Sequence, residues 1–326
     1  MEYVCKPKEE GGLGLRNLEE ANKVSCLKLI WPILSSKSSL WIQWIHKYLI
    51  RQGSFWSIKE TNSSGSWIWK KLLKLRPLAR DLSKMEVNNV ETVENTYRRR
   101  RLRNPVLKQI ESEILNLQEL GLSQSDDNCR WMRENGEFRT EFLTSQTWNL
   151  IRVHAPRVSW FKGIWFKEST PKFSFLSWLA VHERLSTGDR LLKWNPQANS
   201  ICWLCNTAME TRDHLFFECS FSAEVWRGTI RGLDGVSPSV HWPALIRRLV
   251  TGSSDLLHTF LLRYCFQAAL YAIWFERNKR RVGKAPQAAT RLIIFLDRLI
   301  RNRISFLRKK AGNKYEKTME IWFGSR

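Results

Sequence analysis

The sequence predicts a mainly α-helical protein that contains one small metal-stapled module and one short β-hairpin. Apolar residues recur at spacings of three and four through most of the chain, which is the period of an amphipathic helix. Three cysteines and a histidine gather between residues 202 and 219, as metal ligands do in small modules. Asn135 and Gly136 stand inside a short strand-like run, which indicates a hairpin turn.

The N-terminal part of the chain predicts three helices. Their apolar positions place them at 18–33, from about 39 to 48, and at 67–75. Pro32 is expected to end or kink the first helix, and Pro77 to stop the third, because proline lacks the backbone N–H that a helix needs. The tryptophans at 41 and 44 lie three apart on the second helix, and this spacing predicts that they pack in a core.

The rest of the chain is predicted to be helical apart from the hairpin at 131–142. An amphipathic helix at 105–120 is followed by a polar linker, and two long helices at 256–281 and 287–310 close the chain. Shorter helices are expected at 144–152, at 242–249, and at 184–194 as the continuation of an aromatic stretch at 171–182.

The composition points to a folded, basic protein with a polyanionic partner. Apolar content of 43% and aromatic content of 12% exclude wholesale disorder, and no uninterrupted apolar run reaches the length of a membrane span. The chain holds 53 Lys+Arg against 31 Asp+Glu, a net charge of +22. Such a charge favours nucleic acid as the partner, with an anionic membrane surface second. Residues 263–326 hold 16 basic and four acidic residues, so over half of the net charge lies there.

The N-terminus and the cysteines indicate an intracellular protein. The first 23 residues lack the apolar core of a signal peptide. Seven cysteines are an odd number, and two of them stand in a Cys-x2-Cys pair, which fits a metal site in a reducing compartment better than a set of disulfides. We therefore expect an intracellular location, in the nucleus rather than the cytoplasm.

The strongest chemical signal is the spacing Cys202-x2-Cys205-x8-His214-x4-Cys219. A Cys-x2-Cys turn lets two thiolates reach one ion, and three thiolates with one imidazole suit tetrahedral Zn²⁺. With four protein ligands no position stays open for a substrate, so the spacing predicts a structural zinc ion rather than a catalytic one. Single cysteines elsewhere are expected to be ordinary thiols.

Basic residues in two regions are candidates for phosphate contact. The first region is a run of four arginines that can bind phosphate or serve as a nuclear import signal, but that also fits a solvated charged face: Arg98, Arg99, Arg100 and Arg101. The second region comprises the two long C-terminal helices, where the candidates are Arg277, Lys279, Arg280, Arg281, Arg298, Arg301 and Arg308. Trp203, between two of the metal ligands, is a candidate for stacking on a base.

The cysteine motif and its surroundings resemble a known family. The stretch Pro171–Ala180, the segment Arg184-Leu-Ser-Thr-Gly-Asp-Arg-Leu191, the Cys/His cluster and Trp226 together resemble the reverse-transcriptase zinc-binding domain. That domain occurs near the C-terminus of plant non-LTR (LINE-type) retrotransposon polyproteins. The resemblance implies a division into 1–95, a helical remnant that follows a polymerase core; 96–128, a basic helix and linker; 129–235, the zinc-binding domain; and 236–326, a basic helical region.

The sequence departs from an intact polymerase. Its one Asp-Asp pair, Asp126-Asp127, lacks flanking strand residues, and two adjacent aspartates of a polymerase must hold two Mg²⁺ ions. The chain opens where the polymerase core is expected to end, and the spaced carboxylates of a ribonuclease H or an endonuclease are not found. We therefore expect no enzyme, and a residual polymerase acting in trans is the least favoured interpretation.

The sequence thus predicts a structural zinc-binding, non-catalytic protein that associates with RNA or DNA and derives from a retrotransposon reverse transcriptase. The alternative is a degenerate fragment or a protein-interaction module in which zinc serves folding only. Residues 1–95 are then the candidate surface for a protein partner, because helices that once packed on a polymerase leave apolar residues exposed. The sequence leaves the oligomeric state open.

Overall fold

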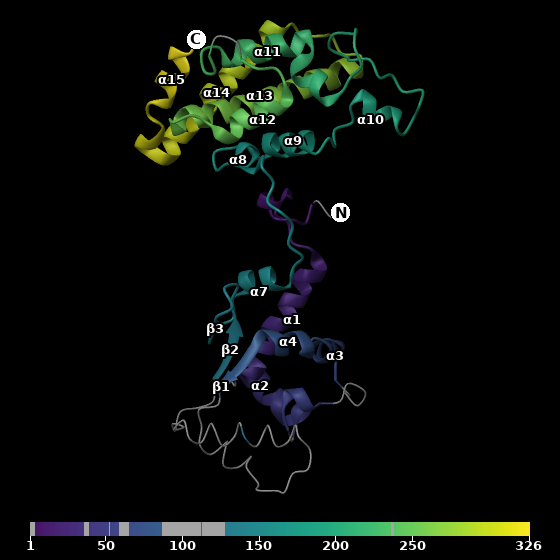
Figure 1. Cartoon of the computed structure of the whole chain (residues 1–326), viewed down its shortest axis with the longest axis vertical. Helices are drawn as coiled ribbons and strands as arrows, with labels where there is room; N and C mark the ends of the chain where they lie inside the picture. Colours follow the sequence, from purple (N-terminus) through teal and green to yellow (C-terminus); the bar gives the residue numbers. More distant parts are fainter. Residues whose placement is uncertain are drawn as a thin grey trace. The chain divides into compact units, whose positions relative to one another are not determined.

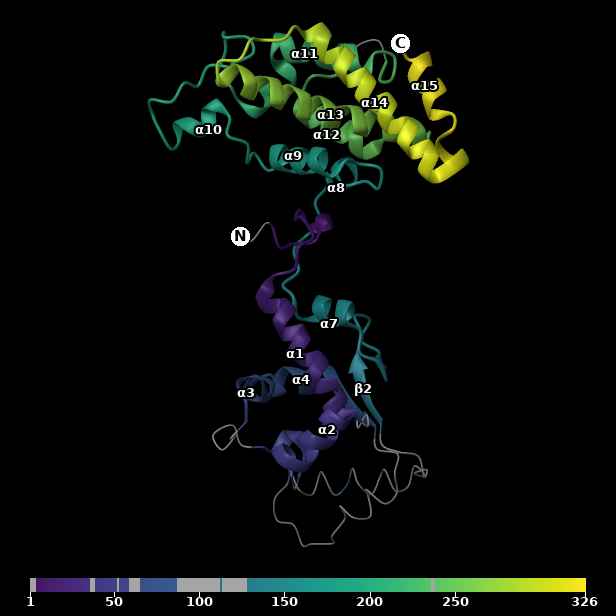
Figure 2. The same cartoon turned by 180° about the vertical axis from the view of Figure 1, so that it is seen from behind.

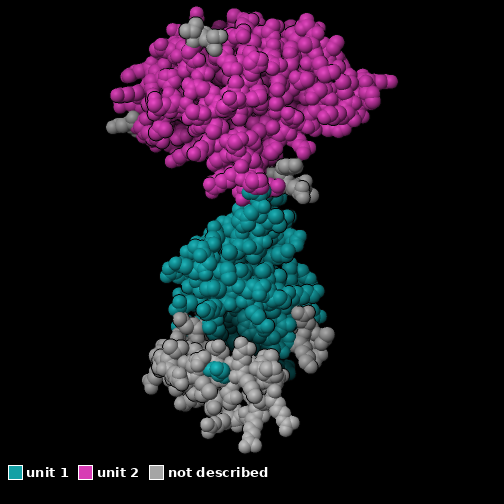
Figure 3. Space-filling view, viewed as in Figure 1, with its two compact units in different colours: residues 1–5, 14–155 teal, residues 6–13, 156–326 magenta. Residues whose placement is uncertain are grey.

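The structure is a computed structural model of the 326-residue chain, and it describes residues 4–35, 39–51, 53–58, 65–86, 112, 128–235 and 238–326. The chain divides into two compact units (Figure 3): unit 1 is residues 1–5 and 14–155, and unit 2 is residues 6–13 and 156–326. The mainly helical class is confirmed, since the described strands form only one small antiparallel sheet. The predicted helix at 105–120 lies outside the described residues.

Unit 1 has helices at the four positions that the sequence predicts, and a further helix at Arg76–Leu82 that was not predicted. Their bounds are α1 (Leu18–Leu34), α2 (Leu40–Trp44, continued by a π-helical turn at Ile45–Ile50), α3 (Trp67–Lys74), α4 (Arg76–Leu82) and α7 (Thr144–Ile151), with a 3-10 turn at Phe55–Ser57.

The predictions for the two prolines have different outcomes: α3 ends at Lys74, before Pro77, as predicted, whereas α1 does not end at Pro32. Helix α1 continues through Pro32 to Leu34, because a proline in the last turn costs only one backbone hydrogen bond. Pro77 lies in the first turn of α4, where a backbone N–H has no hydrogen-bond partner within the helix. Proline is therefore tolerated there, and a new helix begins directly after α3.

A three-stranded antiparallel sheet completes unit 1. The hairpin is confirmed as β2 (Asn128–Met132) and β3 (Phe138–Arg139), and β1 (Ser83–Glu86) pairs with the other side of β2. Strand β1 was not predicted, because Ser-Lys-Met-Glu carries no β-branched or aromatic residue.

The core of unit 1 forms where α1 meets β2. The rings of Trp31 and Trp131 pack edge to face with centroids 5.7 Å apart, and the indole N–H of Trp131 donates to the hydroxyl of Thr147 at 2.9 Å. Trp41 and Trp44 are 42% and 50% exposed, so the prediction that they belong to a core is wrong. Helical spacing shows which residues share a face but not whether another element covers it.

Unit 2 contains the Cys/His cluster and the two long C-terminal helices (Figures 1 and 2). Its elements are a 3-10 turn at Lys8–Glu10, α8 (Phe161–Ile164), α9 (Pro171–Val181), α10 (Gly188–Leu192), a π-helical turn at His214–Glu218, α11 (Ser220–Ile230), α12 (Trp242–Thr251), α13 (Leu256–Arg281), α14 (Ala289–Ala311), a 3-10 turn at Gly312–Tyr315 and α15 (Thr318–Gly324).

Helix α13 is the central helix of unit 2, and α9, α11 and α14 pack around it (Figures 1 and 2). Phe266 on α13 stacks on Phe217 with centroids 5.5 Å apart and meets Trp226 edge to face. Among the described helices, α13 is the one long and apolar enough to cross a membrane, but most of it is buried inside the unit, as in the core helix of a folded domain.

The predicted continuous helix at 184–194 is shorter in the structure. Helix α9 ends at Val181, Glu183 adopts a left-handed conformation with φ 53°, and α10 covers only Gly188–Leu192. The left-handed residue turns the chain out of the helix, so a loop separates the two helices.

The N-terminal segment 6–13 belongs to unit 2. The carbonyl of Gly11 accepts hydrogen bonds from Nε1 of Trp178 and Nε2 of His182 on α9, both at 2.8 Å. The carbonyl of Glu9 accepts from the backbone N–H of Val158 at 2.9 Å. Residues 6–13, which include Gly11 and Gly12, are therefore part of the unit that holds the Cys/His cluster.

Gly12→Ala is expected to destabilise unit 2 by about 1–3 kcal/mol, because overpacked sites cost about that much. A Cβ at residue 12 would lie 1.9 Å from the carbonyl oxygen of Lys6, so the backbone must move. Thermal unfolding followed by tryptophan fluorescence measures the loss. Gly324→Ala is the control, since a Cβ there meets no atom within 4 Å; equal melting temperatures for the two variants would contradict the steric argument.

Candidate metal centre

The first two cysteines lie on a tight turn. The backbone N–H of Asn206 donates to the carbonyl of Cys202 at 2.8 Å, and Asn206 has a φ of 57° in the left-handed region. The N–H of Cys202 donates to the carbonyl of Ala208 at 2.8 Å, which closes the loop. The N–H groups of Leu204 and Cys205 point at the sulfur of Cys202. The turn thus presents both sulfurs on one side and supplies them with backbone donors.

The third and fourth candidate ligands flank the π-helical turn His214–Glu218. The N–H of Cys219 donates to the carbonyl of His214 at 2.7 Å, which holds the two residues one turn apart. Cys219 directly precedes α11, and the N–H groups of Phe221 and Ser222 in its first turn hydrogen-bond to the sulfur. A helix N-terminus favours a negative charge at this position.

The structure brings all four side chains together. Their ligand atoms lie within 4.8 Å of one another, and Sγ of Cys205 is 3.3 Å from Nε2 of His214. Tetrahedral zinc, with Zn–S of about 2.3 Å and Zn–N of about 2.0 Å, needs ligand atoms about 3.5–3.8 Å apart. The donor set therefore suits one tetrahedral ion, and the Cys205–His214 separation is already close to the value that zinc requires. Within the part of the chain that the structure describes, no other group of His, Cys, Asp or Glu is arranged in this way.

The surroundings of the cluster favour the thiolate at two of the three cysteines, Cys205 and Cys219. The sulfur of Cys219 accepts a hydrogen bond from Cys202, which lowers the pKa of Cys219 to about 6 although burial opposes the shift. The same hydrogen bond, together with burial, raises the pKa of Cys202. Burial acts to raise the pKa of Cys205, but hydrogen bonds from Thr207 and Ala208 outweigh it and the pKa is lowered. Deprotonated sulfur is the form that binds a metal.

A buried ion pair joins the cysteine loop to α13. Glu210 and Arg277 are both 0% exposed, and Nε of Arg277 donates to the two carboxylate oxygens of Glu210 at 3.0 and 3.1 Å. Arg277 also donates to the carbonyl of Ser186 at 3.0 Å. Glu210 in turn accepts the backbone N–H groups of Gly188 at 3.1 Å and Trp203 at 3.4 Å. The pair therefore holds the Cys202–Cys205 turn in place through the backbone N–H of Trp203.

The comparisons with known proteins agree with this geometry. Residues 142–226 match the family described as zinc-binding in reverse transcriptase. This segment is similar to the reverse-transcriptase zinc-binding domain. A "Putative ribonuclease H protein" of Arabidopsis thaliana is 23% identical over an alignment that covers 68% of this chain and 42% of the relative. No solved structure matches the chain.

Two of the arginines predicted to contact nucleic acid form contacts within unit 2. Arg277 has no exposed surface, which corrects the prediction for this residue. Arg280 donates to the carbonyl of Leu204 at 2.9 Å and forms an ion pair with Glu276 at 2.9 Å. Arg277 and Arg280 follow Ile273 by four and seven residues, so they lie on the apolar side of the helix. This spacing is the sequence signal that could have distinguished them from solvent-exposed basic residues.

The other C-terminal candidates lie at the surface of unit 2. Arg281, Arg298 and Arg308 are exposed, whereas Lys279 is half-buried. Arg301 is half-buried and forms an ion pair with Asp297 at 2.7 Å. These residues come from α13 and α14.

The run of four arginines before the sheet is not among the described residues. The prediction that it contacts phosphate is therefore neither confirmed nor corrected for any of its members, which are Arg98, Arg99, Arg100 and Arg101. The structure thus adds nothing to the choice between phosphate contact, an import signal and a solvated charged face at this run.

The remaining predictions have different outcomes. Trp203 is half-buried, and its backbone N–H donates a hydrogen bond to the carboxylate of Glu210. The division into 1–95, 96–128, 129–235 and 236–326 stays a prediction. The chain passes from one compact unit to the other after residues 5, 13 and 155.

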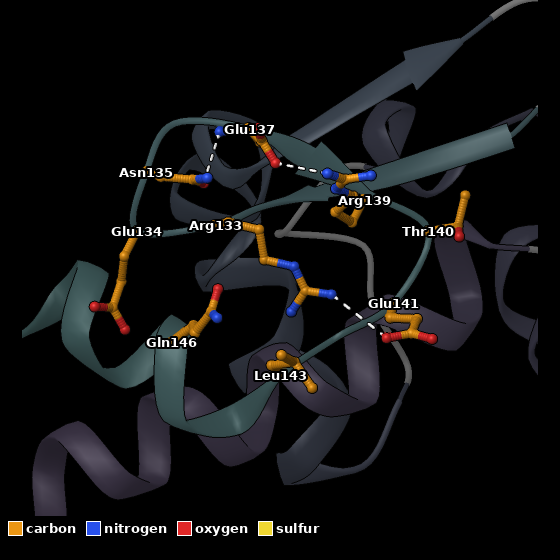
Figure 4. Close-up of a pocket in the computed structure, with 9 residues that line it drawn as sticks. All are labelled: Arg133, Glu134, Asn135, Glu137, Arg139, Thr140, Glu141, Leu143 and Gln146. Carbon is orange, nitrogen blue, oxygen red and sulfur yellow. Dashed lines mark hydrogen bonds and ion pairs between the residues drawn. The ribbon is translucent and has the colours of Figure 1, made fainter.

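A polar pocket in unit 1 contains three glutamates but does not resemble a metal site (Figure 4). Glu137 pairs with Arg139 at 2.8 Å, and Glu141 lies 3.6 Å from Arg133. Glu134 accepts a hydrogen bond from Asn149 at 2.8 Å. Each of the three carboxylates thus has a neighbouring side chain as its partner. The Cys/His cluster is therefore the stronger candidate for a metal site.

Proposed function

We propose that this protein is a non-catalytic, zinc-stapled nucleic-acid-binding protein derived from a retrotransposon reverse transcriptase. The observation that carries the proposal is the closed Cys₃His cluster inside a reverse-transcriptase zinc-binding domain, in a unit whose surface helices are strongly basic. The match to the Arabidopsis thaliana protein supports the same origin, and it spans less than half of that protein's length.

We assign the zinc ion a structural role. Cys202, Cys205, His214 and Cys219 would hold it, and the ion supplies cross-linking of two turns rather than activation of a water molecule, since four protein ligands leave no open position. The buried Glu210–Arg277 pair behind the loop supports this role, because rigid outer contacts keep ligands in place.

Association with nucleic acid follows from the charge of unit 2. Residues 263–326 have a net charge of +12, and exposed arginines and lysines lie along α14, with the exposed Arg281 at the end of α13. Such a basic surface attracts phosphates over a distance set by ionic strength. In an intact element, the corresponding domain would help to hold template or target near the polymerase. We place the protein in the nucleus for the same reason.

The full chain is expected to bind a fluorescein-labelled RNA oligonucleotide with an affinity that falls steeply with salt. Each phosphate contacted contributes about 0.7 to the slope of log K against log[salt] for a single strand. Fluorescence anisotropy between 50 and 300 mM KCl measures the slope, and contact with at least three phosphates requires a slope of about 2 or more.

The control is an uncharged peptide nucleic acid of the same sequence, which offers bases without phosphates. If the protein binds neither RNA nor DNA at the lowest salt, nucleic-acid association is ruled out and zinc serves folding alone. Primer extension and RNA hydrolysis assays on the same preparation are expected to show no product, and any metal-dependent turnover would overturn the non-catalytic assignment.

A further inference from the structure

A groove of about 650 Å³ lies between α13 and α14 of unit 2, with the start of α9 at its edge. It does not include the Cys/His cluster. Its size is in the range of sites that hold a small ligand, so it is a hollow rather than a flat basic surface. Its walls combine aromatic rings with positive charges.

The aromatic part of the groove is exposed to solvent. Phe275 on α13 and Phe295 on α14 are 53% and 51% exposed, and Ile294 beside them is 67% exposed. Tyr271 lies one turn before Phe275, and the two rings are nearly parallel, with an interplanar angle of 8° and centroids 6.2 Å apart. Exposed apolar residues gathered in one hollow indicate a binding site rather than chance.

Four cations line the groove beside these rings. Nζ of Lys172 lies 4.8 Å from the centre of the Tyr271 ring, and Nζ of Lys279 lies 4.9 Å from that of Phe275. Arg291 and Arg298 face the groove from α14 and are exposed. In the described part of the chain, none of the four has a carboxylate partner.

The one acidic residue in the lining does not offset these charges. Glu276 is 2% exposed, pairs with Arg280 at 2.9 Å and accepts the backbone N–H of Gln287 at 2.8 Å. The groove is therefore positive as well as aromatic, so its occupant must offer both negative charge and planar faces.

We propose that this groove binds single-stranded nucleic acid, with bases stacked on Phe275 and Phe295 and phosphates held by Lys172, Lys279, Arg291 and Arg298. The inference rests on the proposed nucleic-acid association and specifies its site and its strand form. A single strand presents unstacked bases to aromatic side chains, whereas a duplex hides these faces inside its stack. An apolar peptide would fill the hydrophobic part but leave four cations uncompensated.

The test compares an aromatic variant with the wild-type protein on a fluorescein-labelled twelve-nucleotide uridine strand and on an RNA duplex. Phe275→Ala with Phe295→Ala is expected to weaken single-strand binding about 10- to 100-fold, because each stacked base contributes strongly and independently of charge. Duplex binding and the salt slope are expected to stay unchanged. Phe323→Ala is the matched control, since Phe323 is 55% exposed on α15 and does not line the groove.

A charge variant tests the same groove in a second way. Arg291→Gln with Arg298→Gln is expected to reduce the single-strand salt slope by about 1.4, at about 0.7 per lost phosphate contact. Lys162→Gln with Lys167→Gln serves as its control, because both residues are exposed in unit 2 but lie outside the groove and outside the basic segment 263–326. Zinc content and circular dichroism of each variant establish that it is folded.

The outcomes separate the two proposals. If the wild-type protein binds no nucleic acid, both the proposed function and the groove assignment are wrong. If the wild-type protein binds but the aromatic variant retains single-strand affinity within twofold, or loses duplex affinity equally, the groove assignment alone is wrong. Binding to vesicles with 30% phosphatidylserine that the groove variants abolish, while RNA binding persists, would also overturn it in favour of a lipid surface.

Discussion

Cys219→Ser is expected to abolish stoichiometric zinc binding and to unfold the segment around residues 196–226. The serine hydroxyl is not deprotonated near neutral pH, so the variant keeps three ligands and loses the thiolate that sits at the start of α11. Structural zinc contributes about 10–16 kcal/mol of apparent binding free energy in small modules, and in such modules this energy is also folding energy. The loss should therefore exceed that of an ordinary core substitution.

Two measurements check the expectation. Atomic emission should give close to one zinc per chain for the wild-type protein and much less for Cys219→Ser, and Cys205→Ser should behave in the same way. Limited proteolysis should cut within residues 196–226 in these variants and in the chelated wild-type protein. Cys5→Ser is the control, because Cys5 is not part of the cluster. Equal zinc content in all three variants would falsify the ligand assignment.

Glu210→Gln and Arg277→Met are each expected to destabilise unit 2 by about 3–5 kcal/mol, because breaking a fully buried ion pair leaves an unpaired charge in the interior. The combined variant should lose less than the sum of the two, since no isolated charge remains. Urea unfolding followed by tryptophan fluorescence provides the free energies for this double-mutant cycle. Purely additive losses would contradict direct coupling between the two side chains.

The same pair should also affect the metal. Glu210 accepts the backbone N–H groups of Gly188 and of Trp203, between the first two ligands, with its two oxygens; glutamine has one acceptor oxygen and cannot keep both contacts. Outer contacts of this kind typically change metal affinity about 10- to 100-fold. Competition with a chromophoric chelator measures the change in Glu210→Gln. Glu19→Gln is the control: Glu19 and Lys23 form an exposed pair on α1, and neither zinc affinity nor melting temperature should change.

Local patterns predicted most of the helices and the candidate ligands. Helix α13 lies at Leu256–Arg281 as predicted, because its apolar period is long and Asp255 caps it through the N–H of Leu257 at 2.9 Å. The four candidate ligands fall within 18 residues, so local turns alone suffice to bring them together. Both predictions depend on contacts between residues close in sequence.

Contacts between distant residues could not be predicted in this way. Strand β1 has no strand signal of its own and exists because β2 offers it a partner. The exposed state of Trp41 and Trp44 likewise depends on what covers α2, which their helical spacing does not specify.

The sequence by itself determined the helical class, the Cys/His spacing and the basic C-terminal region, because each depends on residue type and short-range periodicity. Only the tertiary structure decided which basic residues face solvent. Arg277 is buried because Glu210, 67 residues earlier, offers it a carboxylate inside the protein, whereas Arg298 on the next helix stays at the surface. A charged side chain is buried where folding supplies a partner, and a partner so distant in the chain becomes known only once the helices are packed.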